Sequence, residues 1–211
     1  MNSSHIKVIL FDLGNVVIHL DEQESYRQIA ELSRISYQDL SRKVGEAGFF
    51  NEYEKGLISE DVFRNEIRKL VGAPELADHH IEEAWNGMLL KIDPRVIEAI
   101  SQLSNRKRIM VLSNTNSIHE KAFHKMLREV SSYRHLDQIF EKVYLSHEIN
   151  QRKPDGASWQ HILDDNPGLL PEEILFLDDK TENLAAADAM NIHTKQILHP
   201  EKTISLIEKI A

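Results

Sequence analysis

Residues 7–17 have the sequence Lys-Val-Ile-Leu-Phe-Asp-Leu-Gly-Asn-Val-Val, and the remaining motifs of the chain can be related to this segment. The apolar run 8–11 is too short for a helix and is typical of a buried strand. It ends at Asp12, after which Gly14 and Asn15 permit the backbone bends of a tight loop. Open α/β sheets bind ligands beyond the carboxyl ends of their strands, so Asp12 is either a turn residue or a site residue.

The composition of the chain argues against several classes of protein. Acidic residues outnumber basic ones, 34 to 25, and long basic runs are absent, so a surface for nucleic acid or anionic membrane is not expected. There is no cysteine, which excludes disulfides and thiolate chemistry. The sequence has no signal-peptide pattern and no apolar run of the ~20 residues that span a bilayer. We therefore expect a soluble cytoplasmic protein.

The segment 21–92 contains no convincing strand, and its apolar spacing predicts a series of helices. Ser59 is typical of a helix N-cap, and Gly72 of the position that follows a helix. Residues 45–50 (Gly-Glu-Ala-Gly-Phe-Phe) predict a turn that carries aromatic side chains. The expected helices lie at about 22–34, 36–44, 59–71 and 80–90.

From residue 93 onward, strand and helix patterns alternate. Strands are expected at 109–112, 140–145, 174–177 and 193–198, and helices at about 94–103, 118–129, 157–163, 182–190 and from 201. This alternation predicts an α/β protein with a parallel sheet and right-handed crossovers. Its core would comprise residues 1–20 and 93–211, with 21–92 as a helical insert.

Polar side chains follow three of the predicted strands. They are Asp12, the pair Ser113 and Asn114, and the pair Asp178 and Asp179. Because the carboxyl ends of parallel strands share one edge of a sheet, we expect these side chains to lie together. Lys153, in the sequence Arg-Lys-Pro, lies in the loop after the predicted strand 140–145 and would add an ammonium group.

This set of groups is suited to binding a divalent cation and a phosphate together. Carboxylates from two strand ends offer the hard oxygen ligands of Mg²⁺, which also accepts substrate phosphate as a ligand. The cation and Lys153 would offset the repulsion between Asp12 and a phosphate dianion. Asp12 could then attack phosphorus and form an aspartyl-phosphate that water hydrolyses, while Ser113 and loop amides hold the phosphoryl oxygens.

Four motifs in this order resemble those of the haloacid dehalogenase-like (HAD) superfamily. They are Phe-Asp-Leu-Gly-Asn-Val at 11–16, Val-Leu-Ser-Asn at 111–114, Arg-Lys-Pro at 152–154, and Phe-Leu-Asp-Asp at 176–179 with Asn183 four residues beyond. The first motif, and the second extended as Leu-Ser-Asn-Thr-Asn, are similar to those of bacterial α-D-glucose-1-phosphatase-type phosphatases. The resemblance implies a Rossmann-like core with an inserted all-helical cap, which selects the leaving group.

The resemblance also implies a role for each motif residue. Asp12 would be the nucleophile and a metal ligand, and the carbonyl of Gly14 and Asp179 would complete the Mg²⁺ ligands, with Asp178 nearby. Phosphate would be bound by Ser113, Asn114 and Lys153.

One position departs from many phosphatases of the superfamily. Their second Asp, two residues after the nucleophile, protonates the leaving oxygen and then activates water, but here the residue is Gly14. Loss of such a group typically costs ~10²–10⁴-fold in rate. Three explanations remain open: a leaving oxygen of low pKa, such as an anomeric hydroxyl; a substitute residue, Asp21 or His19; or poor catalysis.

The sequence therefore predicts a Mg²⁺-dependent phosphatase of a small metabolite, in particular a sugar phosphate, without nucleic-acid or membrane partners. The alternatives are a 2-haloacid dehalogenase-type hydrolase and a protein that binds a phosphate ligand with weak or no catalysis. Phe49, Phe50 and Trp85 are expected in the core of the cap, and Asn183 is either a motif residue or a surface residue. Most of the 11 histidines are expected to face solvent.

Overall fold

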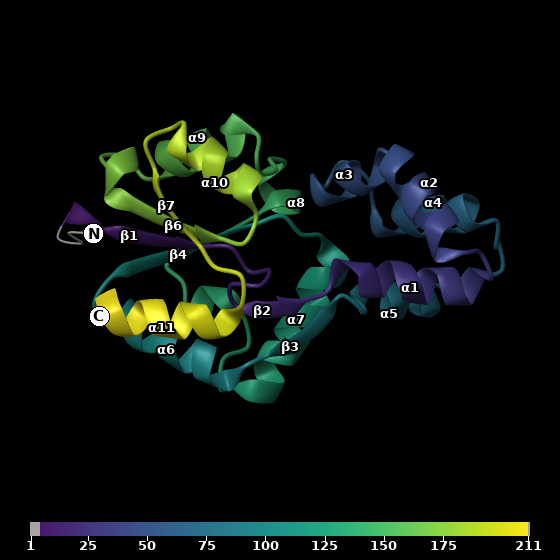
Figure 1. The fold of residues 1–211 in the computed structure, drawn as a ribbon, viewed down its shortest axis with the longest axis horizontal. Helices are drawn as coiled ribbons and strands as arrows, with labels where there is room; N and C mark the ends of the chain where they lie inside the picture. Colours follow the sequence, from purple (N-terminus) through teal and green to yellow (C-terminus); the bar gives the residue numbers. More distant parts are fainter. Residues whose placement is uncertain (1–4, 211) are drawn as a thin grey trace.

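The computed structural model describes residues 5–210, and its centre is a five-stranded parallel sheet with the order β5-β4-β1-β6-β7 (Figure 1). The strands are β1 (Val8–Phe11), β4 (Arg108–Ser113), β5 (Lys142–Leu145), β6 (Ile174–Asp178) and β7 (His193–Gln196). β1 lies between β4 and β6, in a register that opposes Phe11 to Val111 and Leu177. The strand that carries residues 8–11 is therefore central, as its continuous burial requires.

Helices cover both faces of this sheet. Side chains of β1 alternate between the faces, so Ile9 and Phe11 join one apolar cluster while Val8 and Leu10 join another. The first cluster is closed by α6 (Pro94–Ser104), α7 (Ser117–Val130) and α11 (Pro200–Ile210). The second is closed by α9 (Gly156–Asp165) and α10 (Thr181–Asp188), which lie on the opposite side of the sheet in Figure 1.

Helices α1 to α5 form a separate group beyond the carboxyl ends of the strands (Figure 1). They are α1 (Glu22–Ser33), α2 (Tyr37–Glu46), α3 (Phe49–Glu54), α4 (Glu60–Val71) and α5 (Asp78–Asn86), which we call the helical insert. The insert has its own apolar cluster, in which the Phe63 ring lies 4.2 Å from Tyr53 and 5.1 Å from Trp85, measured between centroids. As predicted, Ser59 caps α4, and Gly72 ends it in the left-handed conformation.

Two short strands that the sequence analysis missed connect the insert to the core. β2 (Ile18–Leu20) and β3 (Leu89–Ile92) pair antiparallel and carry the chain into and out of the insert. The predicted helix 80–90 is wrong at its end, because α5 stops at Asn86 and β3 follows. Such short strands lack a periodic signal of their own and form because each supplies the backbone partners of the other.

The prediction of a turn at 45–50 is wrong at both ends, because α2 continues to Glu46 and Phe49 begins α3. These rings stack on each other at 4.2 Å, and Phe50 contacts Phe63 and Trp85, so burial in the insert favours the helix. The strand expected from residue 140 begins at Lys142. Short segments complete the fold: α8 (Ser146–Ile149), η2 (Leu136–Gln138) and η3 (Pro171–Glu173). Across residues 5–210, none of the helices combines the length and apolar composition needed to cross a membrane.

Candidate active site

A buried ammonium group forms the centre of the site. The Nζ of Lys153 donates hydrogen bonds of 2.7 Å to Asp12 Oδ1 and 2.7 Å to Asp178 Oδ2. Asp12 directly follows β1 and Asp178 ends β6, so the pairing of these adjacent parallel strands brings the two carboxylates together. All three side chains are buried: Lys153 is 1% exposed, Asp12 8% and Asp178 0%.

The adjacent acids Asp178 and Asp179 have different environments. Asp178 accepts hydrogen bonds from the Nδ2 of Asn183, at 3.1 and 3.0 Å, and from the backbone N–H of Lys180 at 2.8 Å. Asp179 accepts instead from the Nδ2 of Asn15 at 3.0 Å. Asn183 is thus a buried partner of Asp178, and the alternative of a surface residue is wrong. The acid pair does not cap α10 in the usual way, since the N-cap position is Lys180 and makes no side-chain cap bond.

The residues after β4 support the lysine. The carboxamide of Asn114 donates to the carbonyl of Lys153 at 2.8 Å and accepts from its N–H at 2.9 Å. This double hydrogen bond fixes the backbone of Lys153, and it occupies the Asn114 side chain. Ser113 is buried at the end of β4 and lines a cavity beyond this edge of the sheet. The helix that follows is capped by Asn116, whose side chain accepts from the N–H of His119.

The carboxylates outnumber the cations at this edge of the sheet. Oxygens of Asp12, Asp178 and Asp179 lie within 4.8 Å of one another, with Lys153 as the buried ammonium among them. Burial raises the pKa of Asp12 to about 7, because desolvation and the neighbouring carboxylates outweigh the effect of Lys153. Burial also raises the pKa of Asp179. Hard oxygen ligands with excess negative charge are the donor set that suits Mg²⁺, so these residues fit that cation.

Gly14 is in close contact with its surroundings. A Cβ at this position would lie 2.6 Å from Leu20 Cδ1 and 3.5 Å from Asp12 Oδ2. A side chain here would have to displace the end of Leu20. Neither proposed substitute for the missing acid lies in the cavity. Asp21 caps α1 and pairs with Arg27. His19 Nε2 lies 3.3 Å from Glu201 Oε1. Both side chains therefore have partners outside the cavity.

A cavity of about 360 Å³ lies between this site and the helical insert. Its apolar wall includes Phe50, Trp85 and Met88 from the insert side. The prediction that Phe49, Phe50 and Trp85 pack in the core of the insert is confirmed, and Phe50 and Trp85 also face the cavity. The volume is at the lower end of the ~300–1,000 Å³ range of small-molecule pockets.

Two ion pairs cross the cavity between the core and the insert. Lys180 Nζ lies 2.6 Å from Glu22 Oε1 at the start of α1, and Arg152 Nε lies 2.5 Å from Glu54 Oε2 at the end of α3. All four of these residues line the cavity. The cavity therefore has an apolar wall and charged groups near the loops of the core.

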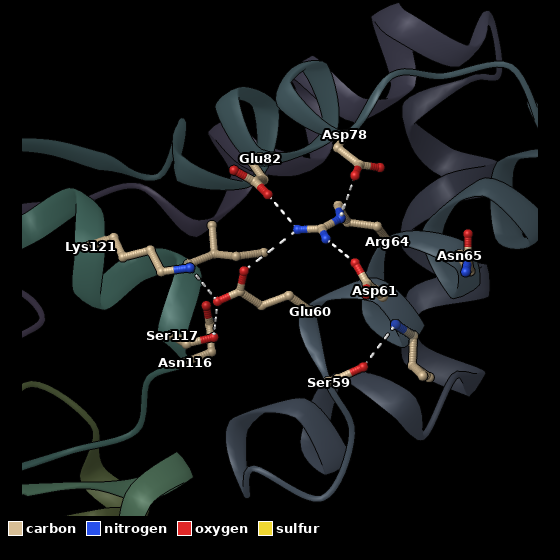
Figure 2. A network of polar contacts seen from close by, with 12 residues as sticks. Ser59, Glu60, Asp61, Arg64, Asn65, Asp78, Glu82, Asn116, Ser117 and Lys121 are labelled. Atoms are coloured by element: carbon tan, nitrogen blue, oxygen red, sulfur yellow. Dashed lines mark hydrogen bonds and ion pairs between the residues drawn. The ribbon is translucent and has the colours of Figure 1, made fainter.

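A second polar network joins the insert to α7 (Figure 2). Glu60 of α4 accepts hydrogen bonds from Ser117 Oγ at 2.7 Å and Lys121 Nζ at 2.6 Å. Behind it, the guanidinium of Arg64 contacts Glu60 and three further acids of the insert, Asp61, Asp78 and Glu82. Since α7 begins directly after the Ser113–Asn116 loop, this network fixes the insert relative to the site.

A family model described as haloacid dehalogenase-like hydrolase matches residues 6–191. The chain belongs to this family. The predicted family, the hydrolase class and the α/β fold are therefore confirmed. A curated relative of this HAD-like hydrolase is the D-ribitol-5-phosphate phosphatase of Bacteroides thetaiotaomicron, 28% identical over 191 residues that cover 90% of this chain and 91% of the relative.

Solved structures agree with this assignment. A predicted HAD-like family hydrolase from Porphyromonas gingivalis has a TM-score of 0.87 and 32% identity, with 98% of both chains covered. A HAD family enzyme of Bacteroides thetaiotaomicron, solved with magnesium and inorganic phosphate, has a TM-score of 0.80 and 33% identity, covering 90% of this chain and 93% of that one. That complex and the acidic cluster of this HAD-like hydrolase confirm the predicted Mg²⁺ cofactor.

His119 is among the residues of the cavity wall that the sequence analysis missed. It is 6% exposed, its Nδ1 lies 2.9 Å from Asn86 Oδ1, and its ring stacks on Trp85 with centroids 5.0 Å apart. Burial lowers its pKa to about 3. The expectation that most histidines face solvent is wrong, because five of the 11 are exposed and His119 is buried. The available signal was its place in the first turn of the helix after the polar strand end, a position that faces the ligand side of an α/β sheet.

Proposed function

We propose that this HAD-like hydrolase is a Mg²⁺-dependent phosphatase that acts on a small hydroxylated metabolite, a sugar or polyol phosphate. The observation that carries the proposal is the buried Lys153 between Asp12 and Asp178, at the floor of a cavity with excess negative charge. The substrate class is supported by the D-ribitol-5-phosphate phosphatase relative and by the polar groups of the cavity, among them Asn51 and Lys180.

In this proposal Asp12 is the nucleophile. One carboxylate oxygen forms a bond to phosphorus while the bond to the ester oxygen breaks, which gives an aspartyl-phosphate and an alcohol that takes up a proton. Water then attacks the same phosphorus and releases inorganic phosphate and the free Asp12 carboxylate. Lys153 stabilises the negative charge of both steps and Ser113 Oγ donates to a phosphoryl oxygen. Asn114 acts through Lys153, because its carboxamide holds the backbone of that residue.

The metal ligands in this proposal are Asp12, Asp179 and the carbonyl of Gly14, with Asp178 beside them. A bound Mg²⁺ would supply positive charge that offsets the repulsion between the phosphate dianion and Asp12. Asp178 is already held by Lys153, Asn183 and a backbone N–H, so its main role is to position the lysine. Asn15 holds Asp179 at the rim of the cavity.

We further propose that residues 21–92 form the cap and that residues 1–20 and 93–211 form the catalytic core. The pairs Glu22–Lys180 and Glu54–Arg152 keep the cap closed over the cavity. Closure excludes water from the aspartyl-phosphate until the alcohol has left. The apolar wall of the cap and its charged rim would then select the leaving group.

Gly14 supports a preference within the substrate class. With no acid at this position, a leaving oxygen that needs little protonation reacts faster than an ordinary alkoxide. We therefore expect an anomeric phosphate such as glucose 1-phosphate to be hydrolysed faster than its isomer glucose 6-phosphate. Both esters form the same aspartyl-phosphate, so the leaving oxygen affects the first step only, and kcat/KM is the quantity to compare.

The test is phosphate release from a panel of sugar, polyol and nucleotide phosphates, with Mg²⁺ and with EDTA, by the wild type and Asp12→Asn. We expect turnover that needs Mg²⁺ and falls by at least about 10³-fold in the variant, because the nucleophile is lost. Asp21→Asn, whose carboxylate pairs with Arg27 outside the cavity, is the matched control and keeps its activity. Halide release from 2-haloacids that persists in EDTA would favour a dehalogenase. Phosphate binding without turnover would favour a ligand-binding protein.

A further inference from the structure

The imidazole of His119 occupies a defined orientation at the junction of core and cap. It belongs to the first turn of α7, and the Asn116 cap holds its backbone N–H at 3.0 Å. Its ring lies nearly parallel to the Trp85 ring, with 15° between the planes. Its Nδ1 is 2.9 Å from the carboxamide oxygen of Asn86. The backbone, the ring face and one ring nitrogen of His119 are thus all held in place. The contacts to the ring face and to the nitrogen come from Trp85 and Asn86 of the cap helix α5.

This arrangement determines which nitrogen carries the proton. A carboxamide oxygen only accepts hydrogen bonds, so with the Asn86 oxygen facing it Nδ1 is the N–H and Nε2 holds the lone pair. Burial lowers the pKa of His119 to about 3, which keeps the ring neutral at physiological pH. His119 therefore presents an acceptor at Nε2, and this acceptor does not become a cation when the pH falls moderately.

The Nε2 atom has no hydrogen-bond partner within residues 5–210, although its residue lines the cavity. It is also not among the fully enclosed unpartnered polar atoms, so it remains reachable from the cavity. An acceptor that reaches the cavity and has no protein partner can receive a hydrogen bond from a ligand that donates one. A phosphate does not fit, because its oxygens are acceptors too. A hydroxyl group fits, since it donates one hydrogen bond.

We propose that His119 Nε2 accepts a hydrogen bond from a hydroxyl of the alcohol part of the substrate and so selects hydroxylated phosphate esters. This inference rests on the phosphatase function proposed above and names a specificity-determining residue for it. The phosphate occupies the floor of the cavity at Lys153, and the alcohol extends past His119 beneath Trp85. The stacked ring pair gives the hydroxyl an apolar surround in which its hydrogen bond strengthens.

The test couples one atom of the protein to one atom of the substrate. Values of kcat/KM are measured for the best sugar or polyol phosphate of the panel, for its monodeoxy analogues, and for phenyl phosphate, which has no hydroxyl. Two variants separate the imidazole nitrogens. His119→Asn retains a donor near Asn86 but loses the acceptor at Nε2, whereas His119→Gln places an amide oxygen near Nε2. His124→Asn, on the same helix but outside the cavity, is the control.

We expect removal of one particular hydroxyl to lower kcat/KM about tenfold in the wild type, the value of a neutral hydrogen bond of about 1.4 kcal/mol. In His119→Asn the same removal should have no effect, so the coupling disappears, while His119→Gln restores most of it. The ratio of kcat/KM between the polyol phosphate and phenyl phosphate should fall about tenfold in His119→Asn and stay unchanged in the His124 control.

Several outcomes would overturn the inference. A deoxy series with no sensitive hydroxyl in the wild type does so without any variant, even where His119→Asn fails to fold. Equal losses on the polyol phosphate and phenyl phosphate in His119→Asn would assign a structural role to the residue. If the wild type releases phosphate from neither substrate, the proposed phosphatase function fails, and this inference with it. If phenyl phosphate is hydrolysed but no substrate hydroxyl is coupled to His119, the inference is refuted and the phosphatase function stands.

Discussion

Two buried cations, Lys153 in the core and Arg64 in the helical insert, each face more carboxylates than one cation can neutralise. Lys153 contacts Asp12 and Asp178, with Asp179 close by, and Arg64 contacts four acids of α4 and α5 (Figure 2). The two side chains have similar burial, 1% and 9% exposed. What differs is the burial of their acids.

The acids around Arg64 are more exposed than the two acids that Lys153 contacts. The side chains of Asp61 and Asp78 are 82% and 55% exposed, whereas Asp12 is 11% and Asp178 0% exposed. Accordingly, hydrogen bonding to Arg68 lowers the pKa of Asp78, while burial raises that of Asp12. Water screens the excess charge in the insert, and a bound cation must do so in the core. The excess of carboxylates around Arg64 is therefore a structural feature, whereas the excess around Lys153 indicates a functional site.

Removal of the two cations should therefore have unequal effects, and this is the largest difference that we expect. Lys153→Met leaves two carboxylates buried beside an apolar side chain, which costs about 3–5 kcal/mol of stability. Arg64→Met should cost less, because its acids remain hydrated. The measurement is urea unfolding of both variants at pH 7, together with phosphate release. Lys153→Met should also lose turnover, and equal losses of stability would contradict the comparison.

The strand ends of the site could be predicted from the sequence, and their supporting contacts could not. Asp12, Ser113 and Asp178 each end an apolar run, and parallel pairing alone brings such ends to one edge. The hydrogen bonds from Asn114 to the backbone of Lys153 join residues 39 positions apart. No local pattern encodes this contact, so it could not be predicted, and phosphate binding by Asn114 stays a prediction.

The same limit explains the errors in the fold. The helix α3 forms because Phe50 packs on Phe63 and Trp85, which come from two other helices. Glycines and aromatics at 45–50 indicated a turn because local propensity was the only information in that segment. β2 and β3 stabilise each other across about 70 residues of insert, and neither has a pattern alone. Tertiary contacts decided each of these elements.

Magnesium should stabilise the core site and not the insert, which is the next largest effect. A ligand that binds the folded state alone adds about 2.7 kcal/mol at one hundred times its Kd. We expect the midpoint of thermal unfolding to rise with Mg²⁺ in the wild type and to change little in Asp179→Asn. Asp61→Asn, an exposed acid beside Arg64, is the matched control and should keep the full response. Loss of the response in both variants would mean that the metal binds elsewhere or broadly.

A smaller effect extends the comparison from charged groups to a neutral one, His119. Its pKa of about 3 in the folded protein lies below the value of 6.5 expected when unfolded, because burial disfavours the imidazolium. The unfolded chain therefore binds a proton more readily, so this stability is present above pH 6.5 and is lost as the pH falls toward 3. At pH 5 the loss amounts to about 2 kcal/mol.

Other groups also titrate, so the measurement is the difference between wild type and His119→Gln in urea unfolding from pH 7 to pH 5. The wild type should lose about 2 kcal/mol more than the variant, because glutamine takes up no proton. If the free energies of unfolding of wild type and variant fell in parallel with pH, His119 would be hydrated in solution. Burial would then not explain the difference between the surroundings of Lys153 and those of Arg64.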